Sequence, residues 1–136
     1  MKLSKNFTLA EMLYSPTGMR LGIDNTPSQQ VIANLQTLVD NTLQPIRDLH
    51  GKSIQVNSGY RSPALNKAIG GAVSSQHMEG KAADFTAGSK TLNKNLFDKI
   101  VSSNIQYDQL IDEIDYQWIH VSFNAGRNRK QILHLK

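Results

Sequence analysis

A histidine and an aspartate stand close together in a stretch of small and polar residues. His77 precedes Asp84 by seven positions within residues 75–84, and Gly80 lies between them. Glycine adopts backbone conformations that other residues resist, so this stretch can fold back and bring the imidazole to the carboxylate. A histidine nitrogen and a carboxylate oxygen both suit zinc, but two ligands do not make a metal site. A loop histidine that is hydrogen-bonded to a neighbour fits the same spacing.

A second histidine lies in a segment that alternates in the manner of a β-strand. Within Trp118–Phe123, every second residue is apolar, and His120 occupies one of the intervening positions. The apolar face should meet the core, so His120 faces a groove or solvent from a rigid strand. A strand holds a ligand in fixed geometry, although an ordinary surface histidine fits this position as well. We predict structural roles for His50, beside Gly51 at a helix end, and for His134.

Three blocks of the sequence, taken in order, resemble a known family. They are Ser58-Gly59-Tyr60-Arg61-Ser62-Pro63, Ser75-x-His77-x-x-Gly80-x-Ala82-x-Asp84 and Trp118-x-His120. In these blocks the chain is similar to zinc D-Ala-D-Ala carboxypeptidases and to related phage endolysin peptidases, which share their fold with the hedgehog signalling domain. The resemblance covers residues 57–129 and includes the segment 107–111.

The resemblance implies a hedgehog/DD-peptidase-like α+β domain with one zinc ion as cofactor. It implies that His77, Asp84 and His120 bind the zinc and leave the fourth position to water, and that Ser75 and Arg61 contact the substrate. Zinc with three protein ligands lowers the pKa of its water to about 7 and polarises a scissile carbonyl. Arg61 adds a fixed cation whose donors can reach a substrate carboxylate or the oxyanion formed during attack, and we count it among the catalytic residues.

The chain departs from the family pattern at the residue expected to move protons. Many members carry an acidic residue three positions before the last histidine, where this chain has Gln117, and glutamine cannot take a proton from water. Glu113 corresponds to a glutamate that some small members carry on the preceding strand, from where it would lie opposite or diagonal to His120. We predict Glu113 as the general base and hold Asp115 second. The alternative is that these carboxylates, with Asp112, only form the solvated end of a hairpin.

Periodicity and capping signals predict the elements that position these residues. Thr26-Pro27 starts a long helix with an apolar stripe, which ends at Gly51 and is kinked or broken at Pro45. We expect Ser15-Pro16-Thr17-Gly18 to end a first short helix and residues 72–81 to form a loop. The other predicted helices are 9–14, 63–69 and 89 or 91 to 103, and the predicted strands are 53–58, 82–85, 107–114, 118–123 and, at the edge, 131–135. This order indicates a single α+β domain over residues 1–136, with helices packed on a small, mainly antiparallel sheet.

Composition narrows the classes of protein that fit. The 136 residues contain no cysteine, which excludes disulfide scaffolds, thiolate zinc fingers, iron–sulfur clusters and cysteine nucleophiles. No stretch has the ~18 apolar residues of a membrane span, and no apolar run of signal-peptide length follows the charged start. We therefore expect a soluble monomer made in the cytoplasm and released by phage lysis or exported by a partner.

The charge balance is mildly basic, at +4. The richest basic cluster, Arg127, Arg129 and Lys130, lacks interleaved aromatic residues, so we predict a solvated tail rather than a nucleic-acid site. The leading hypothesis is a zinc peptidase that cuts peptides of bacterial peptidoglycan, either at the terminal D-Ala-D-Ala bond or at a stem or cross-bridge amide. A non-catalytic zinc-containing module that binds cell wall or peptide is the alternative, motivated by Gln117. A basic nucleic-acid-binding domain is the third and weakest hypothesis.

Overall fold

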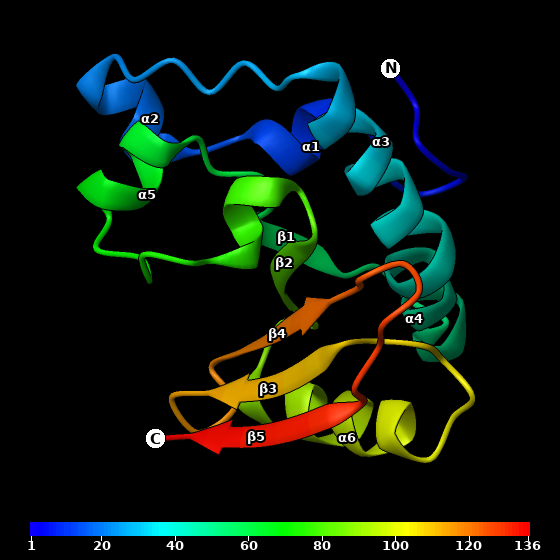
Figure 1. Ribbon diagram of the computed structural model, residues 1–136. Coiled ribbons are helices and arrows are strands. Elements are labelled where there is room, and N and C mark those ends of the chain that lie inside the picture. Colours follow the sequence, from blue (N-terminus) through cyan, green and yellow to red (C-terminus); the bar gives the residue numbers. More distant parts are fainter.

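One five-stranded sheet forms the framework of the computed structural model, which describes residues 1–136 (Figure 1). The strand order is β1-β2-β4-β3-β5, and all neighbours are antiparallel except β3 and β5. The strands are β1 (Gln55–Ser58), β2 (Ala82–Thr86), β3 (Gln109–Glu113), β4 (Trp118–Ser122) and β5 (Gln131–Leu135). The predicted α+β domain with a small, mainly antiparallel sheet is confirmed.

Most helices begin after a serine or threonine whose side-chain oxygen accepts a hydrogen bond from a backbone amide of the first turn. Such caps satisfy amides that have no partner within the helix. The capping residues are Thr8, Ser15, Ser28, Ser62, Ser75 and Ser89. The helical segments are α1 (Leu9–Leu13), α2 (Pro16–Leu21), α3 (Gln29–Leu38), the π-helical turn η1 (Val39–Leu43), α4 (Gln44–His50), α5 (Pro63–Ala68), the 3-10 turn η2 (Gln76–Glu79) and α6 (Lys90–Val101). None of them has the length and apolar character that a membrane span requires.

Two helix predictions need correction. Ser15-Pro16 does not merely end α1, because Ser15 caps a further helix, α2, with Pro16 at its first position. The long helix begins after Ser28 rather than Thr26, and η1 interrupts it just before Pro45. Proline has no amide hydrogen to donate. Just before it, the backbone hydrogen bonds of the helix shift to the wider π spacing, in which the Gln44 amide donates to the Val39 carbonyl. The break expected around Pro45 is therefore present, as a π-turn.

The later part of the chain also differs from expectation in two places. Residues 72–81 contain the turn η2 rather than an unbroken loop, because Ser75 caps it. The edge strand β5 was predicted, but it runs parallel to β3 rather than antiparallel. After β4 the chain crosses to the far side of β3 through residues 124–130, and this crossover fixes the direction of β5.

The two faces of the sheet have different surroundings. One face is buried under the α3–η1–α4 rod and α6, and it forms the core. Core residues include Leu35, Leu43, Ile46, Phe85, Phe97, Ile100, Leu110, Ile119 and Val121. The opposite face of β2, β3 and β4 lines a cavity. Figure 1 shows α1, α2 and α5 gathered at one end of the molecule, away from β3, β5 and α6.

Candidate metal centre

Asp84 and His120 face each other across adjacent strands. The register of β2 and β4 pairs these two residues directly, and His120 Nδ1 lies 2.9 Å from Asp84 Oδ1. Ile119 and Val121 are fully buried, so alternation turns His120 to the opposite face of the sheet, as the sequence predicts. Strand pairing alone therefore fixes the distance between these two side chains.

His77 reaches the same point from η2. Ser75 Oγ accepts a hydrogen bond from the His77 backbone amide at 3.1 Å and so starts the turn. Gly80 ends it with a φ of 73°, and a Cβ there would lie 2.9 Å from the Val31 carbonyl oxygen. Only glycine fits this position without strain, and the chain passes from it directly into β2. The predicted folding back of this stretch, which brings His77 to Asp84, is confirmed.

A backbone carbonyl fixes the orientation of the His77 ring. The Gly59 carbonyl oxygen lies 2.7 Å from His77 Nδ1, and a Cβ on Gly59 would lie only 2.4 Å from the Met12 carbonyl oxygen. A carbonyl only accepts, so Nδ1 carries the hydrogen of the neutral ring and Nε2 carries the free lone pair. His77 Nε2 lies 3.3 Å from Asp84 Oδ1 and has no hydrogen-bond partner, although it is buried.

The donor set and its spacing fit a zinc ion. One ligand atom each from His77, Asp84 and His120 lies within 4.8 Å of the other two. Two tetrahedral ligands at about 2.0–2.1 Å from zinc lie about 3.3–3.5 Å apart. The distances of 3.3 and 2.9 Å from Asp84 Oδ1 to the two histidine nitrogens are close to that separation. The unpartnered lone pair of His77 then has a partner, so these three residues form a candidate metal centre.

The candidate ligands favour the ionised form of Asp84. Burial raises the pKa of this carboxyl, but the hydrogen bond from His120 and the close imidazole of His77 outweigh burial and hold the pKa well below its usual range. A carboxylate rather than a carboxylic acid is the form that binds a metal. Asp84 is thus in the ligating state at neutral pH.

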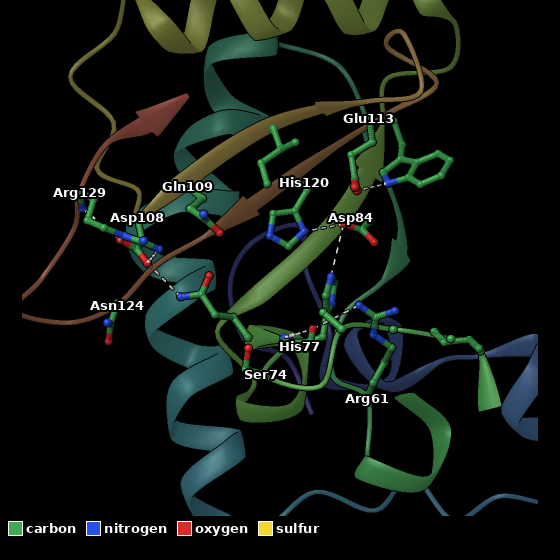
Figure 2. A pocket seen from close by; sticks show the side chains of 18 of the residues that line it. Arg61, Ser74, His77, Asp84, Asp108, Gln109, Glu113, His120, Asn124 and Arg129 are labelled. Carbon is green, nitrogen blue, oxygen red and sulfur yellow. Dashed lines mark hydrogen bonds and ion pairs between the residues drawn. The ribbon is translucent and has the colours of Figure 1, made fainter. Parts of the chain in front are cut away.

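The candidate metal centre lies in the wall of a cavity of about 690 Å³, which Figure 2 shows from close by. The cavity also receives side chains from the link between β1 and α5, from the approach to η2, from β3 and from the segment after β4. Polar residues of its lining include Arg61, Ser74, Ser75, Gln76, Asp108, Gln109, Glu113, Trp118, Asn124, Arg127 and Arg129.

Among the residues considered as general base, Glu113 is the one at the cavity. Glu113 pairs with Trp118 in the β3–β4 register, two positions along from the pair of Ile111 with His120, so it lies diagonal to His120 on the same face of the sheet. Its Oε2 accepts a hydrogen bond of 2.7 Å from Trp118 Nε1. Asp115 is 78% exposed and lies 3.9 Å from Lys90, outside the cavity lining.

The remaining polar residues of the hairpin behave differently. Gln117 is exposed and does not line the cavity. Asp112 is buried, so the idea that all the hairpin carboxylates are solvated is wrong for this residue. The position of Glu113 matches the sequence analysis, and its role as base stays a prediction.

Arg61 and Ser75 lie together at the cavity. Arg61 Nη2 lies 3.5 Å from Ser75 Oγ, while Arg61 Nε is buried with no hydrogen-bond partner. Burial lowers the pKa of the Arg61 guanidinium, and the negative charges of Asp84 and Glu113 act in the opposite sense. An arginine with an unused buried N–H group can donate a hydrogen bond to an acceptor atom of a ligand. Contact of both residues with substrate stays a prediction.

Comparison with known proteins agrees with this geometry. A family model described as Peptidase M15 matches residues 5–122. The chain belongs to the peptidase M15 family. It is also 51% identical over 49 residues to a zinc D-Ala-D-Ala carboxypeptidase from Streptomyces albus G. That match covers 35% of this chain and only 19% of the relative.

Asp108 is a buried carboxylate of this M15 domain that the sequence analysis missed. Arg129 donates to it from its backbone amide, from Nε and from Nη2, and Gln76 donates from Nε2. The Arg129 side chain is the main cause of a pKa of about 2 for Asp108. In the strand predicted over residues 107–114, Asp108 falls on the same side as Leu110. An acidic residue at a core-facing position requires a partner, and this was the signal available in the sequence.

The basic cluster after β4 is exposed, as the sequence predicts, but it is not a free tail. Arg129 binds the buried Asp108, and both Arg127 and Arg129 line the cavity. Lys130 instead lies 5.7 Å from the centre of the Tyr107 ring. Two members of the cluster therefore belong to the surroundings of the candidate metal centre.

Proposed function

We propose that this M15 domain is a zinc-dependent peptidase that hydrolyses peptide bonds of bacterial peptidoglycan, as a D-Ala-D-Ala carboxypeptidase or an endolysin-type endopeptidase. The observation that carries the proposal is the convergence of His77, Asp84 and His120 on one point of a cavity wall, with the His77 lone pair unpartnered. The family and the zinc carboxypeptidase relative support a peptide substrate.

His77, Asp84 and His120 would hold the zinc ion. When bound, zinc polarises a scissile carbonyl and lowers the pKa of a water molecule to about 7. The Gly59 carbonyl keeps the His77 ring in the required tautomer and orientation. The strand pair β2–β4 keeps Asp84 and His120 in register without any contribution from mobile loops.

Glu113 is the group that moves protons in this proposal. It takes a proton from the attacking water as the new C–O bond forms, and it gives that proton to the amide nitrogen as the C–N bond breaks. Trp118 Nε1 already donates a hydrogen bond to Glu113 Oε2, so Glu113 Oε1 is the oxygen that takes the proton. Arg61 donates to the carbonyl oxygen as it gains negative charge, or to a substrate carboxylate.

Hydrolysis assays with and without a chelator test this function. Purified peptidoglycan and a synthetic stem pentapeptide ending in D-Ala-D-Ala are incubated with the zinc-loaded protein, and mass spectrometry identifies the products. We expect cleavage of a peptide bond that stops on chelation, returns with zinc, and is strongly reduced in Glu113→Gln.

Two other outcomes would contradict the proposal. Binding of zinc-loaded protein to peptidoglycan with no released product would support the non-catalytic binding module instead. Cleavage that continues at an undiminished rate after complete removal of the metal would exclude a zinc-dependent reaction.

A further inference from the structure

The cavity has a second polar end that the proposed hydrolysis does not use. In Figure 2, Arg129, Asp108 and Asn124 lie on one side of the two candidate histidine ligands, and Arg61 and Glu113 lie on the other. Arg127 also lines the cavity.

Arg129 is fixed in place at this second end. Its Nε lies 2.8 Å from Asp108 Oδ1 and its Nη2 lies 3.0 Å from Asp108 Oδ2. Asp108 is 2% exposed and is held as well by Gln76 Nε2 at 3.0 Å. A guanidinium has five N–H donors, and this ion pair uses two of them. Since the Arg129 side chain remains 48% exposed, its other donors are available to a ligand in the cavity.

Arg127 supplies an uncompensated positive charge next to this pair. Arg129 already neutralises Asp108, whereas Arg127 takes part in no ion pair of the structure. The turn that carries it is braced, because the Arg127 amide donates to the Asn124 carbonyl and the Asn124 amide donates to Asn128 Oδ1. This end of the cavity thus carries a net positive charge on a defined backbone.

We propose that Arg127 and Arg129 form a subsite for a carboxylate of the peptide substrate, on the side of the candidate metal centre opposite Arg61. The proposal rests on the proposed function for its substrate and adds a requirement for a negative charge away from the cleaved bond. Guanidinium groups bind carboxylates through paired charge-assisted hydrogen bonds. A neutral carboxamide carries no charge and cannot accept such a pair of hydrogen bonds. The carboxylates of Asp84 and Glu113 in the same cavity disfavour a polyanion such as a nucleic acid.

Two synthetic peptides that differ by one charge test this subsite. The first is the stem pentapeptide L-Ala-γ-D-Glu-L-Lys-D-Ala-D-Ala with a free glutamate α-carboxylate, and the second carries a carboxamide there. Values of kcat and KM are measured for zinc-loaded wild type, Arg127→Gln and the control Arg20→Gln. Arg20 is exposed on α2 and outside the cavity, so the control removes the same charge elsewhere.

The expected result is a change in KM that depends on the carboxylate. Arg127→Gln should raise KM for the carboxylate peptide about tenfold, leave kcat nearly unchanged, and alter KM for the carboxamide peptide less than about twofold. Arg20→Gln should match wild type with both peptides. Equal KM values of the two peptides in wild type, or an equal rise for both in Arg127→Gln, would overturn the subsite.

Failure of the proposed hydrolysis is a separate outcome. If zinc-loaded wild type cleaves neither peptide, calorimetry on the same samples gives Kd directly, and the same dependence on charge and on Arg127 is expected. A single-stranded oligonucleotide that binds more tightly than the carboxylate peptide, and loses binding in Arg127→Gln, would contradict the proposal in favour of a nucleic-acid site.

Discussion

Two histidine–aspartate clusters share this sheet, and only one has the properties of a metal centre. At the cavity, His77 and His120 approach the same oxygen of Asp84, at 3.3 and 2.9 Å. Elsewhere, His134 of β5 lies beside Asp112 of β3, with Nδ1 2.6 Å from Oδ2. Both clusters join residues from adjacent strands or turns and contain the same residue types.

The clusters differ in what remains unsatisfied. Asp112 accepts from His134 at one oxygen and from the Tyr116 amide at the other, at 2.9 Å, and no third ligand joins them. The His134 ring packs against Phe97, with 5.4 Å between ring centres. At the cavity, His77 Nε2 has no partner. Convergent donors with an unused lone pair beside open space therefore distinguish a metal centre from a structural ion pair.

The largest expected effect is on catalysis at the cavity cluster, where the proposed base Glu113 lines the same cavity. Glu113→Gln removes the titrating group and keeps the size, so kcat should fall about 10²–10⁴-fold with zinc content unchanged. Asp115→Asn is the matched control and should remain near wild type, because Asp115 lies outside the cavity. Near-wild-type hydrolysis by Glu113→Gln, or loss of activity in Asp115→Asn alone, would reverse the two roles.

Zinc should stabilise the fold through the cavity cluster and not through the His134 pair. At zinc concentrations about 1,000 times Kd, binding to the native state alone adds about 4 kcal/mol to the free energy of unfolding. Thermal melts with and without zinc should give this increase in wild type and in His134→Ala. Asp84→Ala should gain almost nothing, and an equal gain in that variant would place the metal elsewhere.

Arg61 should matter to turnover more than to folding. It has a buried Nε with no partner, so its removal would delete the proposed substrate contact and would break no hydrogen bond at that atom. Arg61→Ala should lower kcat/KM about 30-fold, equivalent to about 2 kcal/mol, with little change in zinc content or Tm. A large fall in Tm would instead identify a structural ion pair.

The smallest effect concerns the acid stability contributed by Asp108. Its pKa is lowered from an ordinary 3.8 to about 2, chiefly by hydrogen bonds from Arg129. Because the folded-state pKa lies below the unfolded one, this stability is fully present above pH 4 and is lost as the pH falls toward 2. Urea unfolding measures the free energy of unfolding across that pH range. Between pH 4 and pH 2, this free energy should fall by about 1–2 kcal/mol less in Asp108→Asn than in wild type. Parallel curves for the two proteins would exclude this contribution.

Several features of the site could be predicted because they depend on local sequence. The turn that returns His77 to Asp84 follows from Gly80 and the short spacing. Strand alternation turns His120 away from the core, and the hairpin places Glu113 diagonal to it. The α+β class followed from helix caps and from the order of the elements.

Other features depend on contacts between distant segments, and the sequence does not encode them locally. The tautomer of His77 is set by the Gly59 carbonyl, whose position depends on close contact with Met12. Asp108 and Arg129 are 21 residues apart, and the crossover that brings them together also makes β5 parallel. The pattern at Ser15-Pro16 serves equally to stop one helix and to start another, so α2 was missed.

Native mass spectrometry counts the zinc ions bound to each chain and so tests the candidate metal centre. One zinc per chain is expected in wild type and in His134→Ala, and none in His120→Ala. The His134 variant removes a histidine of the structural cluster, so it controls for nonspecific loss of imidazole ligands. A wild-type protein without zinc, or a full zinc complement in His120→Ala, would contradict the assignment of His77, Asp84 and His120 as the metal centre.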